Sequence, residues 1–77
     1  MTIRLTKFRT LETGADGGHS YVTSEIEYKG QTRKLVVFFA DKADEQKLKG
    51  RNEITVDGRL IDEKNQSLNL LDSRLID

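Results

Sequence analysis

Cysteine and proline are both absent from this chain of 77 residues, and histidine occurs once. Without cysteine, the protein has no disulfide bond, no thiol nucleophile and no cysteine-ligated zinc site. Proline is one of the means that keep exposed strand edges from pairing with other chains, and that means is missing here. No apolar run approaches the roughly 20 residues of a membrane span, and the first residues lack the basic and then apolar pattern of a signal peptide. We therefore expect a cytoplasmic protein without a membrane partner.

An excess of charge of one sign is also missing, since 13 basic and 13 acidic residues give a net charge of zero. The field of the whole molecule thus gives no reason to expect nucleic acid. The charges are unevenly placed, however. Residues 1–11 and 29–39 contain basic but no acidic residues, whereas residues 53–77 hold six acids against three bases. If the two basic segments lie close together, they form a modest positive surface despite the zero net charge.

Residues that could perform catalysis are few. His19 lies in a glycine-rich segment near Asp16, and one histidine without cysteine supplies too few groups for a metal site or a general base. The glycines of that segment are not followed by Gly-Lys-Ser/Thr, so they do not form a phosphate-binding loop. We expect His19 to be a solvated loop residue. The sequence predicts a protein that is not an enzyme, with no catalytic residue, no metal and no cofactor.

The length allows a single domain over residues 1–77. A chain this short buries only about 60% of the surface that its unfolded form exposes, so its core is marginal. Leu, Ile, Val and Phe together number 21, which is more than intrinsically disordered chains contain. The domain therefore has room for one compact core and one binding surface.

Alternation of polar and apolar residues predicts five strands, at residues 2–11, 21–28, 32–40, 53–62 and 67–76. The first and the last change phase part-way, which indicates a bulge or sharp bend in each, near Thr6-Lys7 in the first. The segment Asp41–Gly50 predicts the one short helix, with Asp41 as its cap and Gly50 as its stop. The predicted order is three strands, a helix and two strands.

This order, and the stretch from Leu48 to Ile76, resemble the OB-fold nucleic-acid-binding domains. The fourth strand of that family often reads apolar-x-apolar-x-Gly-x-apolar, and here Ile54, Val56, Gly58 and Leu60 match it. The resemblance implies an all-β protein, a small five-stranded OB-type barrel with one short helix between strands three and four. It also implies a ligand-binding surface on the outer face of strands two and three.

The pairing of those two strands follows if Lys29-Gly30 is a two-residue turn. Val22 then faces Val37 on the core side, while Tyr21 faces Phe38 on the outer side. Aromatic rings on an outer face can stack with bases, and nearby cations can hold phosphates. The predicted site for single-stranded DNA or RNA consists of Tyr21, Phe38, Lys34, Arg33, Lys7 and Arg9.

Two alternatives remain open at this point. Phe38 and Val36 could instead pack against the loop before the second strand, or against a protein partner or a second copy of the chain in a homodimer. In addition, Glu25 is placed to form a cross-strand ion pair with Lys34, which would cancel the positive charge locally. A protein-protein interaction module, or a subunit of a larger assembly, is the alternative function.

Overall fold

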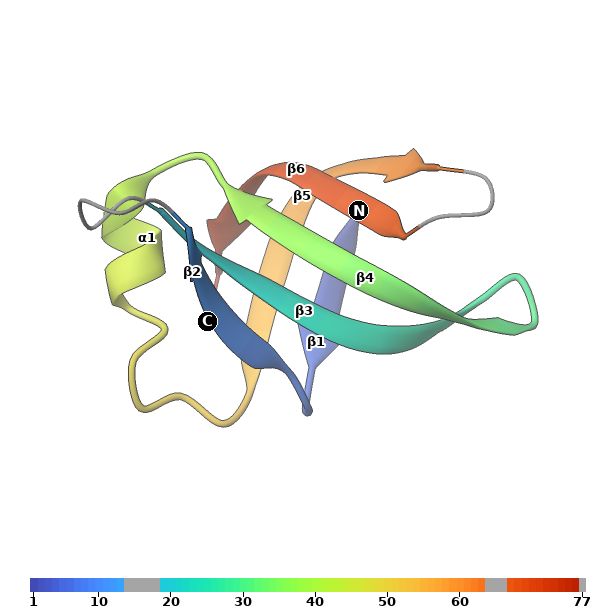
Figure 1. The fold of residues 1–77 in the computed structure, drawn as a ribbon, viewed down its shortest axis with the longest axis horizontal. Coiled ribbons are helices and arrows are strands. Elements are labelled where there is room, and N and C mark those ends of the chain that lie inside the picture. The colour runs from blue at the N-terminus through green and yellow to red at the C-terminus, as the bar shows by residue number, and fades with distance from the viewer. Residues whose placement is uncertain (14–18, 64–66, 77) are drawn as a thin grey trace.

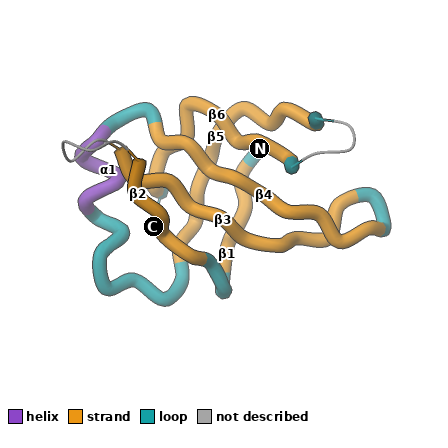
Figure 2. The backbone as a smooth tube through the Cα atoms, viewed as in Figure 1, coloured by secondary structure: helices purple, strands orange, loops and turns teal. Residues whose placement is uncertain are grey.

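The structure is a computed structural model that describes residues 1–13, 19–63 and 67–76. It is mostly β, with six strands in one mixed and strongly curled open sheet, and one short helix (Figures 1 and 2). The strands follow the order β1-β5-β6-β4-β3-β2 across the sheet, and β4 and β6 form its parallel pair. The elements are β1 (Thr2–Leu5), β2 (Arg9–Thr13), β3 (His19–Tyr28), β4 (Gln31–Phe39), α1 (Lys42–Gln46), β5 (Ile54–Asp62) and β6 (Leu68–Leu75).

The prediction of five strands was wrong by one, because the first predicted strand is divided into β1 and β2. β1 pairs with β5, whereas β2 pairs with β3, so the two halves lie at opposite ends of the strand order. The bend predicted near Thr6-Lys7 is confirmed, since residues 6–8, here called the corner, connect the two halves. Figure 1 shows β1 and β5 crossing behind β3 and β4, so the sheet curls into half a barrel instead of closing as a simple five-stranded one.

β1 is fastened to β5 by polar contacts as well as by its ladder. The Met1 ammonium donates to the Gly58 carbonyl at 2.7 Å, and the Thr2 hydroxyl donates to the Asp57 carboxylate at 2.7 Å. The hydrogen bond from Thr2 favours the ionised carboxylate and thereby lowers the pKa of Asp57.

The β3–β4 hairpin has the predicted register throughout. Lys29 and Gly30 form its turn with φ of 50° and 79°, the positive values that such two-residue turns require. Val22 faces Val37, and Tyr21 faces Phe38, as predicted. Val22 and Val37 are fully buried while Phe38 is exposed, so the assignment of the two faces is also confirmed.

The helix lies where it was predicted but is shorter than residues 41–50. After Gln46 the chain continues through bonds that span three residues, from Lys47 N to Asp44 O and from Leu48 N to Glu45 O. Such bonds tighten the end of a helix into a turn. Asp41 is the N-cap, but its side chain makes no capping hydrogen bond, so its predicted capping role was wrong.

The core lies on the concave side of the sheet and under the helix segment. It combines residues from β1, β3, β4, β5 and β6 with Leu48, which follows α1. Its buried members are Leu5, Val22, Leu35, Val37, Leu48, Ile54, Val56, Leu68 and Leu70. Phe8 and Phe39 are half-buried against it.

Gly58 marks the place where β5 crowds β6. The β5–β6 register shifts between Asp57 and Arg59, and Asp72 in β6 has a φ of 52°, which confirms the predicted irregularity of the last strand. A Cβ atom at position 58 would overlap the Ser73 hydroxyl and lie 2.9 Å from the Leu71 carbonyl oxygen. The backbone carbonyl cannot rotate away as the end of a flexible side chain could.

We therefore expect Gly58→Ala to destabilise the protein by about 1–3 kcal/mol, the usual cost of overpacking. Urea denaturation followed by circular dichroism measures this loss. Gly30→Ala is an informative comparison, because a Cβ there meets no atom within 4 Å and only the positive φ opposes it. If Gly58→Ala had the same free energy of unfolding as the parent protein, this result would contradict the close contact between β5 and β6 at position 58.

Candidate nucleic-acid interface

An aromatic pair lies on the outer face of the β3–β4 hairpin. The rings of Tyr21 and Phe38 are stacked, with centroids 5.7 Å apart and planes inclined at 26°. Phe38 is 41% exposed, and Tyr21 is half-buried. The pair results from strand alternation, since the residues next to Phe38 on either side, Val37 and Phe39, turn towards the core. One aromatic side chain of this small protein thus faces solvent beside another.

β2 extends this apolar surface. Leu11 lies opposite Tyr21 in the β2–β3 ladder and is 37% exposed. Val36 lies next to Phe38 in the same row of the outer face, opposite Thr23. We use "outer face" below for Arg9 and Leu11 of β2, Tyr21, Thr23 and Glu25 of β3, and Lys34, Val36 and Phe38 of β4.

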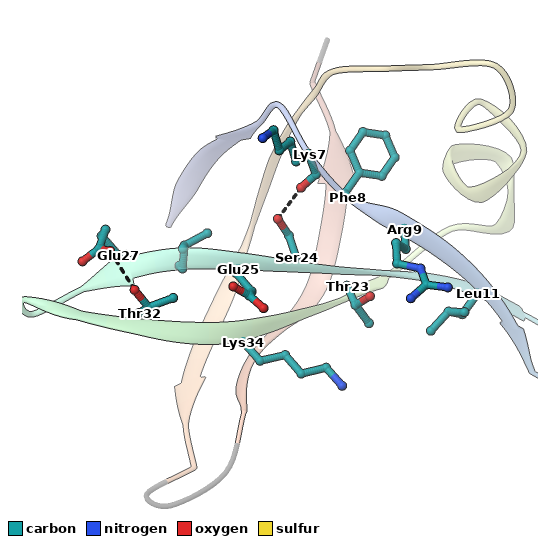
Figure 3. Close-up of a pocket in the computed structure, with 11 residues that line it drawn as sticks. Lys7, Phe8, Arg9, Leu11, Thr23, Ser24, Glu25, Glu27, Thr32 and Lys34 are labelled. Atoms are coloured by element: carbon teal, nitrogen blue, oxygen red, sulfur yellow. Dashed lines mark hydrogen bonds between the residues drawn. The ribbon is translucent and has the colours of Figure 1, made fainter.

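A hollow of about 830 Å³ opens where the corner leaves β3 (Figure 3). The last β2–β3 partners are Arg9 and Thr23, and beyond them the Ser24 hydroxyl donates to the Lys7 carbonyl at 2.5 Å. This bond fixes the corner to β3. We call the space the corner hollow; it is lined by Lys7, Phe8, Arg9, Leu11, residues 23–27, Thr32 and Lys34.

Three of the predicted cations line the corner hollow. Figure 3 shows Lys7, Arg9 and Lys34 reaching from the corner, from β2 and from β4. Within the described residues, none of these three side chains has an ion-pair or hydrogen-bond partner. Some cations elsewhere on the surface are paired, for example Arg4 with Glu53 at 3.0 Å and Arg59 with Asp72 at 3.3 Å.

Arg33, the other predicted cation, is not brought to this surface. It lies opposite Ile26, on the core-facing side of the hairpin, and its guanidinium pairs with the Asp62 carboxylate at 2.9 Å. The bond joins β4 to the end of β5. This placement indicates that Arg33 stabilises the sheet and does not belong to the outer face.

The corner hollow also contains acidic groups. Glu25 is the Cα partner of Lys34, yet neither side chain forms an ion pair with any described residue. Glu27 accepts a hydrogen bond from the Thr32 hydroxyl at 2.8 Å. The cancelling Glu25–Lys34 ion pair is thus not formed, although two carboxylates still moderate the positive field here.

A buried carboxylate holds the start of β3. Glu45 on α1 has a side chain only 5% exposed. It accepts the backbone N–H of Ser20 at 2.5 Å, and its other oxygen lies 3.2 Å from His19 Nδ1. His19 is exposed as expected, but it is the first residue of β3, opposite Thr13, so its prediction as a loop residue was wrong, and its contact with Glu45 was not foreseen. Since Tyr21 follows Ser20 directly, this clamp anchors the strand immediately before the aromatic pair.

Sequence reasoning missed Phe8, Leu11 and Ser24 as parts of the site. The change of phase between Leu5 and Phe8 was a signal for the corner, but it did not reveal which groups the corner would place beside β3. Most of the glycine-rich segment before His19, which was predicted to be a loop, consists of residues 14–18, and these lie outside the described residues.

Comparisons with protein-family models, with curated proteins and with solved structures give no match. The described part of the chain contains no group of three or more His, Asp or Glu side chains that could hold a metal ion. Its one described helix, α1, lacks the length and the apolar character of a membrane-crossing helix.

Proposed function

We propose that this protein is a non-catalytic module of the OB type that binds single-stranded nucleic acid weakly on its outer face. The observation that carries the proposal is the exposed Phe38 ring, stacked on Tyr21, on a face whose cations Arg9 and Lys34 form no ion pair with any described residue. Stacking on aromatic rings and attraction of phosphates by basic side chains are the two means by which proteins bind single strands without reading their sequence.

The connectivity of the sheet supports the OB assignment. If β1 and β2 are counted as one strand bent at the corner, that strand pairs with β3 on one side and β5 on the other. β4 pairs in parallel with β6, and β6 pairs with β5, so the series of strand pairings returns to the bent first strand. In the chain, α1 lies between β4 and β5. An OB barrel presents its second and third strands to oligonucleotides, and under this assignment those two strands are β3 and β4.

The salt dependence of binding tests this proposal directly. Each phosphate contact with a single strand contributes about −0.7 to the slope of log K against log salt. Contacts from Lys7, Arg9 and Lys34 therefore predict a slope of about −2. Fluorescence anisotropy of a labelled oligothymidylate, measured from about 20 mM salt upwards, gives the slope. Binding that is absent at low salt would exclude the proposal.

Quenching of tyrosine fluorescence can show where the ligand binds. The chain has two tyrosines, Tyr21 in the aromatic pair and Tyr28 beside the hairpin turn, where Lys29 Nζ lies 5.4 Å from its ring centroid. In a Tyr28→Phe variant, the remaining emission comes from Tyr21. Quenching of that emission by an oligonucleotide, in parallel with the anisotropy, would place the ligand at the aromatic pair.

A second candidate function is protein-protein interaction. It is favoured by the exposed Leu11 and Phe38, which give the outer face an apolar centre, and by the zero net charge. Large exposed apolar patches commonly mark protein interfaces. A homodimer formed through this face would appear in sedimentation as a species of twice the mass, and its formation would respond little to salt.

A further inference from the structure

A second hollow, of about 640 Å³, lies between β2 and the segment that contains α1 and the turn after it. We call it the helix hollow. β2 and its approach contribute Phe8, Thr10 and Glu12, whose side chains alternate with those that β2 gives to the outer face. The opposite wall comes from the helix and from residues 48–51. Figure 1 shows α1 and the chain that follows it beside β2.

The two hollows meet at Phe8. This ring lines both of them, and it is half-buried at the corner. β2 itself is the last strand in the sheet order, so one of its edges has no strand partner among the described residues. An extended chain can therefore pass over β2 from one hollow to the other without displacing a strand.

Among the described residues, the helix hollow offers an unpaired positive charge to an anionic chain at one residue, Lys49. The Lys49 ammonium has no partner within the part of the chain that the structure describes. Arg51 lies beside it and donates to the Glu53 carbonyl at 3.1 Å. Within the described ranges, the helix hollow contains two acids. Glu45 is buried and contacts the Ser20 N–H and His19, so Glu12 is the exposed carboxylate of the hollow.

We propose that a bound single strand does not end on the outer face but continues over the β2 edge, past Phe8, into the helix hollow, where Lys49 contacts phosphate. This inference rests on the proposed function and extends it, because it assigns a longer footprint to the same ligand. The path combines the cations of the corner hollow with Lys49 along one continuous surface. Glu12 opposes the ligand in its last part.

Labelled oligothymidylates of about 4 and about 16 nucleotides, the range that one OB domain covers, separate the two parts of the path. The long strand should show the steeper salt slope. Lys49→Gln should reduce that slope by about 0.7, the contribution of one phosphate contact, and leave the short strand unaffected. Glu12→Gln should tighten binding of the long strand alone, because a like charge has been removed.

Arg74→Gln is the matched control. Arg74 is exposed on β6, its side chain has no ion-pair or hydrogen-bond partner among the described residues, and it lines neither hollow. Its replacement should therefore change the salt slope for neither oligonucleotide.

The path is overturned if Lys49→Gln and Glu12→Gln leave binding of the long oligonucleotide unaffected, or if they change the binding of both oligonucleotides equally. If Phe38→Ala still weakens both strands in that case, the proposed function stands without the extended path. If neither strand binds the parent protein, both proposals fail.

Discussion

Leu70→Ala should lower the free energy of unfolding by about 2–5 kcal/mol, the usual cost of removing a buried leucine side chain. Leu70 is fully buried on β6, between Val37 of β4 and Leu60 of β5. The neighbouring Leu71 points the other way and is half-buried. Leu71→Ala should therefore cost clearly less, although the two substitutions remove the same atoms from adjacent positions.

Thermal melting followed by circular dichroism compares the two variants. In a domain of this size, 1 kcal/mol corresponds to about 4–8 °C in Tm. Leu70→Ala should thus melt about 8–40 °C below the parent protein, and Leu71→Ala should show a clearly smaller decrease. Equal losses would contradict the difference in burial between Leu70 and Leu71. The effect is large because the core is small and, without cysteine, no disulfide supports it.

The β3–β4 hairpin shows what the sequence could predict. A two-residue turn with glycine fixes which residues face each other, and alternation then assigns every side chain to one face. The information lies within residues 21–39, so no distant contact was needed. The position of the helix was predictable for the same local reason, since the residues that predicted it all lie between Asp41 and Gly50.

Other features depend on partners that are distant in the chain. Residues 2–11 became two strands because each half pairs with a different neighbour, β5 or β3, and the local pattern cannot name those neighbours. Arg33 was predicted to contact phosphate, but in the structure its guanidinium donates to Asp62, which lies 29 positions further along the chain. The burial of Glu45 likewise depends on a distant partner, because its carboxylate accepts the Ser20 N–H from the start of β3.

The adjacent Phe38 and Phe39 allow binding and stability to be tested separately. Phe38 is exposed on the outer face, whereas Phe39 is packed against the core. Phe38→Ala should lose about 1–3 kcal/mol of binding to a single strand, which is about a 5- to 150-fold increase in Kd. Its stability should fall less than that of Phe39→Ala, since the loss comprises about 0.5–1.5 kcal/mol for the aromatic pair and a burial contribution that is reduced by the 41% exposure of the ring.

Phe39→Ala should show the reverse. Its ring is only half-buried, so the loss of stability should approach the lower end of the roughly 3–5 kcal/mol seen for buried phenylalanine. At a temperature where this variant is folded, it should bind the oligothymidylate nearly as the parent protein does, because the outer face is unchanged. Anisotropy titrations and melting curves on the same samples provide both quantities.

The protein-interaction alternative makes a different prediction for the same pair. If the outer face is covered by a second copy of the chain, Phe38→Ala should dissociate a dimer, and its Tm should then depend less on protein concentration than that of the parent protein. Under this alternative, an oligonucleotide would bind neither the parent protein nor the Phe38→Ala variant. Phe38 therefore separates the two functions: removal of one exposed ring changes Kd for nucleic acid under the first, and the oligomeric state under the second.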